Sequence, residues 1–243
     1  MPEIALAEYE RANERDKPGW LLLNEEINKW LSRPGYSIRD KYDNGLQEPS
    51  MVEWSWLMLF SRFERTVKAL LEPAYLFSSE ACLKLESILK EDKRYQNGES
   101  FYFDHCSLPL SELRAHAFQG CPMESYSITW LASFNKADGL TVIAKVTVYA
   151  VARGYTEIVE GKRKICVDAV GLFIHDGFEF SGDQWLGRWS CKDKAVYAFF
   201  WGEELGNINF REFRRRTGYG CDFRTMNNPE IYNVKRFCYY ASL

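Results

Sequence analysis

The stretch Arg163–Trp189, RKICVDAVGLFIHDGFEFSGDQWLGRW, decides the fold that the rest of the sequence predicts. Its first part, from Arg163 to Asp176, is predicted to be a long β-strand. Successive side chains of a strand point to opposite faces, and here both sets are largely apolar, so we expect the strand to be covered on both sides. Asp176 then emerges at the end of a rigid element.

Acidic residues gather directly after this strand. Asp176, Glu179 and Asp183 lie in a short turn rich in aromatic residues and glycine, beside His175. Two carboxylates at the exit of a strand are the arrangement in this sequence that most resembles a site. Asp and Gly are also ordinary turn formers, so a purely structural turn is the alternative. An unpaired buried carboxylate costs several kcal/mol, and Asp176 must therefore be solvated, paired or metal-bound.

Outward from this stretch, the chain alternates apolar and polar residues, which is typical of antiparallel strands. The alternation covers residues 126–134 and 142–150, and Asp138-Gly139 and Glu160-Gly161 are predicted turns. Further strands are predicted at Ala195–Trp201 and Tyr232–Tyr240. A short helix with the sequence FREFRRRTG lies between these two strands.

Helical periodicity dominates the part of the chain before residue 97. Trp20–Leu31 is predicted to be a helix, and Ser50–Leu71 one uninterrupted helix that begins with a capping box of Ser50 and Glu53. A third helix is predicted at about Ser79–Glu91, and the polar segment Asp92–Ser100 is a candidate linker. The buried face of the second helix is predicted to comprise Trp56, Leu59, Phe60, Phe63, Val67, Leu70 and Leu71.

Together these patterns predict an α+β protein. A helical N-terminal region, residues 1–97, precedes an antiparallel, partly barrel-like β-rich domain, residues 98–243, with one late helix. With 243 residues, of which 46% are hydrophobic, the chain is long enough to bury a substantial core.

Charge and hydropathy exclude several classes of function. The net charge of −3 gives no general reason to expect nucleic acid as a partner, and no run approaches the ~18 consecutive apolar residues of a transmembrane segment. The first residues lack the basic-then-apolar order of a secretory signal, so we expect the protein to be made in the cytoplasm. Delivery outside the cell would then need a route without a signal peptide.

The cysteine and histidine patterns favour structural roles. The seven cysteines include no CxxC pair, and they are predicted to be small, unpaired core residues of a reducing compartment. The three histidines form no HExxH motif, and His105 beside Cys106 is expected to be structural because sequence neighbours rarely face each other. No GxSxG, P-loop or GxGxxG motif is present.

The late helix carries a concentration of positive charge. Arg211, Arg214, Arg215 and Arg216 follow one another closely in an otherwise acidic protein. Such a patch is able to hold a phosphate-bearing substrate, nucleic acid or an acidic partner, although no interleaved aromatic pattern supports binding of single-stranded nucleic acid. The alternative is a solvated helix face with the phenylalanines pointing inward.

Four pieces of the chain, taken together, resemble a bacterial domain family of unknown function that is often encoded beside type VI secretion genes. They are NKWLSRPGYSI, WSWLMLFSRFERTVKALL, VGLFIHDGFEFSGDQWLGRW and NINFREFRRRTGYGCDF. The sequence departs from that family at Glu179, where a second Asp is usual, and at Cys221, where a Gly is usual. The resemblance implies a role in competition between bacteria, as a toxin or as its neutralising partner.

The C-terminal half also resembles the activity domain of colicin M-like bacteriocins, which cleave the diphosphate link of lipid II in the periplasm with Mg²⁺. This resemblance assigns Asp176, Glu179 and Arg188 to catalysis, with Asp176 and Asp183 as metal ligands. Carboxylate oxygens suit Mg²⁺, and an arginine suits developing phosphate charge. Phe178 stands where those enzymes have a tyrosine, and their His-Arg pair has no counterpart here.

The sequence therefore leads to two functional hypotheses. The first is a type VI secretion-associated effector, in which Arg211, Arg214 and Arg215 bind a diphosphate-bearing, lipid-linked substrate of the cell envelope and Mg²⁺ assists hydrolysis. The second is a non-catalytic immunity or adaptor protein that binds a cognate toxin or a component of the secretion system. Neither hypothesis involves nucleic acid or a transmembrane segment.

Overall fold

The computed structural model describes residues 50–123, 146–178, 185–190, 195–197, 203–220 and 222–242. The chain forms two compact units, each assembled from separate segments: one from residues 1–50, 125–144 and 176–225, the other from residues 51–124, 145–175 and 226–243. We call them unit 1 and unit 2. The predicted division into a helical region, 1–97, and a β-rich domain, 98–243, stays a prediction.

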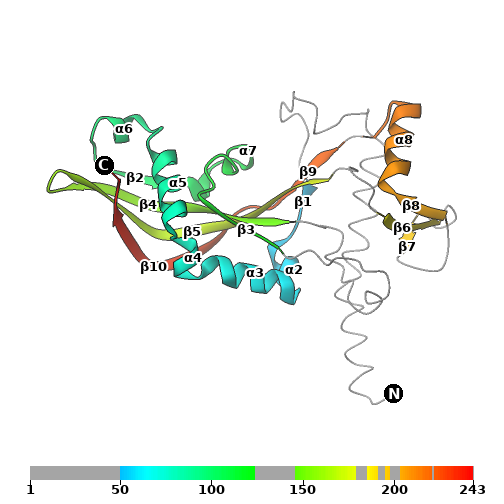
Figure 1. The fold of residues 1–243 in the computed structure, drawn as a ribbon, viewed down its shortest axis with the longest axis horizontal. Coiled ribbons are helices and arrows are strands. Elements are labelled where there is room, and N and C mark those ends of the chain that lie inside the picture. Colours follow the sequence, from blue (N-terminus) through cyan, green and yellow to red (C-terminus); the bar gives the residue numbers. More distant parts are fainter. Residues whose placement is uncertain are drawn as a thin grey trace, which may run out of the picture. The chain divides into compact units, whose positions relative to one another are not determined.

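The main sheet is built on one long hairpin (Figure 1). Its strands are β4 (Thr147–Val159) and β5 (Lys162–Phe178), joined by Glu160 and Gly161 with positive φ angles of 51° and 75°. Two such residues form the tight turn that matches the twist of paired strands, so the predicted Glu160-Gly161 turn is confirmed. Side chains on both faces of β5 are fully buried from residue 165 to 167 and from 169 to 174, glycine apart, which confirms that the strand is covered on both sides.

Each outer edge of this hairpin is shared by two shorter strands. Along β4 these are β2 (Phe101–Asp104) and β3 (Gln119–Pro122); along β5 they are β9 (Phe223–Met226) and β10 (Glu230–Tyr240). β1 (Ser50–Met51) continues the order beyond β9. The pairings of β4 with β2, β3 and β5, and of β5 with β10, are antiparallel, as predicted. Within the described residues the sheet is open. The strand predicted at residues 126–134 lies outside the described part, and of the strand predicted at 142–150, residues 147–150 form the start of β4.

The single helix predicted for residues 50–71 is wrong. Ser50 and Met51 form β1, and the helical segments are α2 (Trp54–Leu57) and α3 (Ser61–Leu71). Val52 donates its backbone N–H to the Met226 carbonyl at 2.9 Å, and this sheet-type bond prevents a helix from starting at Ser50. The predicted capping box is wrong as well, because Glu53 occupies the N-cap of α2 and makes no side-chain cap bond.

The interruption between α2 and α3 also exposes one residue that was predicted to lie in the core. Phe60, Phe63, Val67 and Leu70 are buried as expected, but Leu59 is 57% exposed because it lies in the turn between α2 and α3. The remaining helices of unit 2 are α4 (Pro73–Leu76), α5 (Ser79–Leu89), α6 (Lys93–Gln96), the 3-10 turn η1 (His105–Ser107) and α7 (Leu110–Leu113). Among the helices that the structure describes, none is long and apolar enough to cross a membrane.

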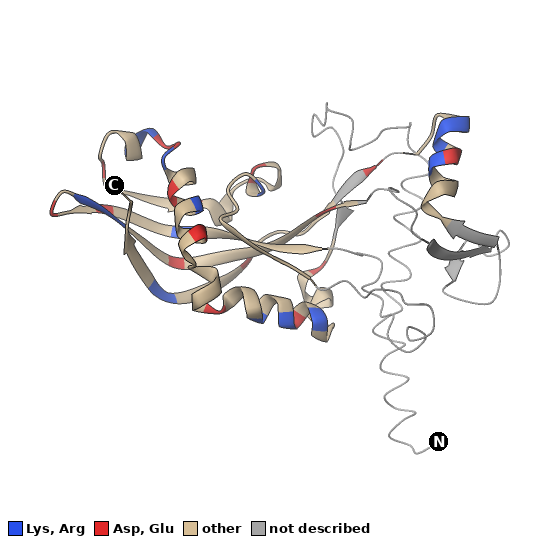
Figure 2. Cartoon of the chain, viewed as in Figure 1, with Lys and Arg blue, Asp and Glu red and all other residues tan. Residues whose placement is uncertain are grey.

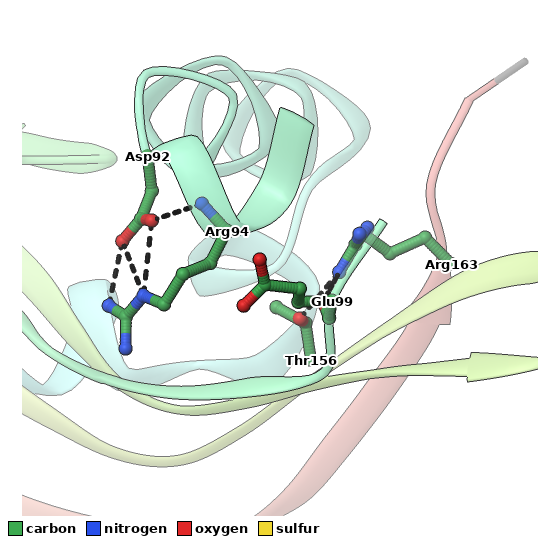
Figure 3. A network of polar contacts seen from close by, with 5 residues as sticks. All are labelled: Asp92, Arg94, Glu99, Thr156 and Arg163. Atoms are coloured by element: carbon green, nitrogen blue, oxygen red, sulfur yellow. Dashed lines mark hydrogen bonds and ion pairs between the residues drawn. The ribbon is translucent and has the colours of Figure 1, made fainter. Parts of the chain in front are cut away.

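An arginine near the tip of the hairpin fastens the loop around α6 to the sheet (Figure 3). Arg163 donates to the carbonyls of Glu99 (2.7 Å) and Tyr95 (3.0 Å) and to the Thr156 hydroxyl (2.8 Å). Its guanidinium also lies 4.2 Å from the centre of the Tyr95 ring. The candidate linker at residues 92–100 therefore contains a short helix and is bonded to β5.

Two cysteines contradict the prediction that these residues are unpaired. Cys166 of β5 and Cys238 of β10 lie opposite each other in the sheet and form a disulfide across 72 residues of sequence. The sequence offered no sign of this bond because the pairing depends on strand register. Among the described cysteines, Cys82, Cys106 and Cys121 are free.

Unit 1 contains a second, smaller sheet and the late helix. The sheet has the order β7-β6-β8, with β6 (Trp185–Ser190), β7 (Ala195–Tyr197) and β8 (Glu203–Gly206). The helix α8 (Asn207–Thr217) confirms the predicted late helix. It starts earlier than predicted, because Asn209 accepts a hydrogen bond from the backbone of Gly206 at 2.8 Å and so caps the helix from within its first turn.

Candidate functional site

Asp176 is the third residue from the end of β5, and it is partly buried. Its Oδ1 accepts a hydrogen bond from the backbone N–H of Gly177 at 2.9 Å. A carboxylate that accepts a nearby amide is what a structural turn requires. Glu179 and Asp183 lie outside the described residues, and for Arg188 only the backbone, in β6, is described. The proposed catalytic set of Asp176, Glu179 and Arg188 stays a prediction.

The arginines of α8 divide into different environments, and Figure 2 shows their charge along the second half of the helix. Arg214 donates from both terminal nitrogens to Asp222, at 3.1 and 3.2 Å, and Asp222 is only 2% exposed. Arg215 is 76% exposed and lies 3.7 Å from Glu212. Arg214 therefore neutralises a buried carboxylate, a role that the sequence did not indicate. Substrate binding by Arg211, Arg214 and Arg215 stays a prediction.

A Mg²⁺ site would need several oxygen ligands held together. The described residues contain no group of three or more His, Cys, Asp or Glu side chains that would hold a metal ion. Of the two predicted ligands, Asp176 is described with one oxygen bonded to a backbone amide, and Asp183 is not described. The predicted Mg²⁺ site thus rests on a single described carboxylate.

Three strands of the main sheet become irregular at the same level. Between β4 and β5 the register shifts at Asp168, and between β5 and β10 it shifts between Asn233 and Phe237. Arg153 and Asp168 form an ion pair here, with 3.7 Å between Nε and Oδ1, and that buried oxygen accepts no hydrogen bond from the described residues. The cluster was missed from the sequence because each charge is isolated within an apolar strand.

His105, in η1, and His116 form a second polar cluster. The rings of His105 and His116 are 4.9 Å apart, and burial, followed by the charge of His116, lowers the pKa of His105 to about 4. Burial raises the pKa of the Cys106 thiol to about 12, so that the sulfur stays protonated and is a poor nucleophile at neutral pH. These environments support the structural interpretation of His105 and Cys106.

A half-open groove of about 380 Å³ lies between the α3–α4 segment and β10. Its helical wall is formed by Leu71, Pro73, Leu76 and Phe77, and its other wall by residues 232–237. Phe77 stacks on Phe237 with 4.1 Å between ring centres, which fixes one end of the groove. We call this the β10 groove. Sequence reasoning missed it because its walls are more than 150 residues apart.

β10 is paired on one side only among the described residues. Its ladder partner is β5, and no backbone hydrogen bond joins its other side to a further described strand. Lys235 and Arg236 are exposed at the irregular part of the strand, and neither has an acidic partner in the described part of the chain. Within the described residues, a strand edge without a further neighbour thus lies beside an apolar groove and beside Lys235, which has no acidic partner there.

Comparison with known proteins identifies the chain at the level of a family. A family of unknown function, DUF6402, matches residues 27–200. The chain belongs to DUF6402. This DUF6402 match covers α2 to α7, the main hairpin and β6, but not β10. Neither the curated proteins nor the solved structures include a match to the chain.

Proposed function

We propose that this DUF6402 protein is a non-catalytic binding protein of an interbacterial competition system, an immunity or adaptor protein that binds a cognate toxin or a secretion component. The observation that carries the binding role is the edge of β10, uncovered in the described part of the chain, beside the β10 groove. The competition role rests on the sequence resemblance to domains encoded beside type VI secretion genes.

An open strand edge supports binding because it presents unpaired backbone donors and acceptors. Extended segments of partner proteins add to such edges through main-chain hydrogen bonds, and neighbouring pockets select their side chains. The described contacts of Asp176 and Arg214 are compatible with structural roles: one oxygen of Asp176 accepts a hydrogen bond from the Gly177 amide, and Arg214 is paired with Asp222.

Co-expression tests this proposal. The chain is produced in the cytoplasm of bacteria together with each product of a neighbouring gene, and growth is followed. We expect growth to be rescued from one toxic product and the two proteins to co-purify. Absence of both rescue and co-purification for all neighbouring products would contradict the binding proposal.

A second candidate is the effector function, delivered to the periplasm without a signal peptide. The observation in its favour is that Asp176 and the arginines of α8 fall within the same compact unit. In this proposal Asp176, Glu179 and Arg188 act in Mg²⁺-dependent cleavage of a diphosphate such as that of lipid II. Asp176 and Asp183 hold the metal, and Arg211, Arg214 and Arg215 bind the substrate.

Periplasmic expression of the chain and of Asp176→Asn tests the effector candidate. The substitution keeps the hydrogen bond to Gly177 and removes the charge that Mg²⁺ needs. Growth arrest by the original chain, lost in Asp176→Asn with an unchanged melting temperature, would favour the effector. Normal growth of bacteria that export the chain with a periplasmic signal would contradict the effector function, and only the binding function would remain.

A further inference from the structure

We infer that the β10 groove binds an extended segment of a partner protein in which a large apolar side chain stands next to acidic residues. This inference rests on the proposed binding function and specifies the chemistry of the partner. It follows from three properties of the groove: its apolar helical wall, the edge of β10 that no described strand covers, and the charge of Lys235, which has no acidic partner among the described residues.

The apolar walls select the apolar side chain. Leu71, Pro73, Leu76 and Phe77 face residues of β10 across about 380 Å³, within the size range of pockets that take a small ligand or a few side chains. The stacked rings of Phe77 and Phe237 make one end of this space rigid. Burying an apolar side chain here removes both it and the groove lining from water.

The strand edge selects an extended backbone, and its irregularity limits which segments fit. β10 has residues 234–236 where β5 has only Asp168, so the regular spacing of edge donors and acceptors is interrupted there. An interrupted and charged edge disfavours pairing with an arbitrary strand. A short segment that pairs beside the irregularity and inserts one side chain into the groove satisfies both conditions.

The positive charge selects acidic residues and disfavours a second copy of the chain. Lys235 lines the groove, and none of the lining residues is acidic. The Arg236 guanidinium lies 5.6 Å from the centre of the Tyr155 ring, on the face that Tyr155 shares with Cys166 and Cys238 and opposite to Phe237, so we assign the charge of the groove to Lys235. Two copies paired through β10 would bring like charges together, which is unfavourable. A partner with acidic residues instead completes the pairs.

The test uses a phage-displayed library of random dodecapeptides, selected against the immobilised full-length chain. The strongest binder is then synthesised with a fluorescent label, and its affinity is measured by fluorescence polarisation. We expect enriched sequences to combine Asp or Glu with an aromatic or aliphatic residue. Because the attraction is partly electrostatic, raising the salt from about 50 to about 300 mM should weaken binding several-fold.

Two variants and one control locate the binding. Lys235→Glu reverses the charge, and Leu71→Asp places a carboxylate on the helical wall of the groove; each should weaken binding at least tenfold. The control Lys84→Glu makes the same change of net charge as Lys235→Glu at an exposed position of unit 2 outside the groove, and it should stay within about twofold. Circular dichroism checks that all variants are folded.

Three outcomes would overturn the inference: no enriched peptide, enriched peptides without acidic residues, or peptides whose binding is unaffected by both groove variants. Its failure is distinguishable from failure of the proposed function. If a toxin still co-purifies with Lys235→Glu and Leu71→Asp, the binding function stands and the groove is not its site. If peptides bind at the groove but no neighbouring toxin is neutralised, the groove is a binding site and the competition role is contradicted.

Discussion

At the scale of single residues, Gly154 shows how little space the sheet leaves where its register shifts. A Cβ at this position would lie 2.0 Å from the carbonyl oxygen of Cys166, which belongs to the backbone of the adjacent strand. Gly154→Ala should therefore lower the free energy of unfolding by ~3 kcal/mol or more, measured by urea denaturation. Gly98→Ala is the control: it meets no neighbouring atom, and its positive φ costs only about 1–2 kcal/mol. Equal losses in the two variants would contradict this explanation.

His105 makes a residue-scale prediction about pH. Its pKa is about 4 in the folded chain against 6.5 without burial, so the unfolded chain binds more protons between these values. The free energy of unfolding should fall as the pH is lowered from about 6.5 to about 4, with His105 contributing at most ~3 kcal/mol. His105→Gln should flatten this dependence in urea denaturation at pH 7 and pH 4.5. An unchanged slope in the variant would show that other groups cause the loss.

At the scale of elements, the disulfide joins the strand at the centre of the sheet to the strand that forms its open edge. Closing a loop of 72 residues restricts the unfolded chain, which in the chain-entropy treatment corresponds to about 4 kcal/mol. Reduction with dithiothreitol should therefore lower the melting temperature by roughly 10 °C, given ~2–4 °C per kcal/mol for a chain of this size. C166A/C238A, insensitive to the reductant, is the control. A melting curve that does not respond to reduction of the original chain would contradict the prediction.

Elements also show what the sequence was able to predict. The β4–β5 hairpin, β10, α5 and α8 follow from periodicity and turn residues, because local preference and tertiary packing agree there. The prediction of one helix at residues 50–71 is wrong because local preference and tertiary packing disagree there. The hydrogen bond from Val52 to Met226 holds the chain extended. The disulfide, the β10 groove and the Arg214–Asp222 pair each depend on register or on contacts distant in sequence, which no local pattern encodes. Of the predicted site, the position of Asp176 near the end of β5 is confirmed, whereas its chemistry stays a prediction.

At the scale of the whole molecule, unit 2 is predicted to fold without residues 176–225. The two ends of unit 2 that flank this segment are close together, because the Ile174 amide donates to the Asn227 side chain at 2.7 Å. Replacing residues 176–225 by a short Gly-Ser linker should preserve the buried residues of the β4–β5 hairpin and cooperative thermal unfolding. Near-ultraviolet circular dichroism measures the retained packing. A featureless spectrum with gradual melting would show that unit 2 needs the deleted segment.

The place of β10 in the sheet has a consequence for the order of events during synthesis. β5 is complete at Phe178, but the strand that covers much of its outer edge begins only at Glu230. At ~5–20 residues per second, the ribosome needs roughly 3–10 s to make residues 179–229. For that time the nascent chain holds an apolar strand that lacks one neighbour, and it is a candidate substrate for chaperones that bind exposed strands. Newly made protein should therefore spend its first seconds without the strand that completes its main sheet.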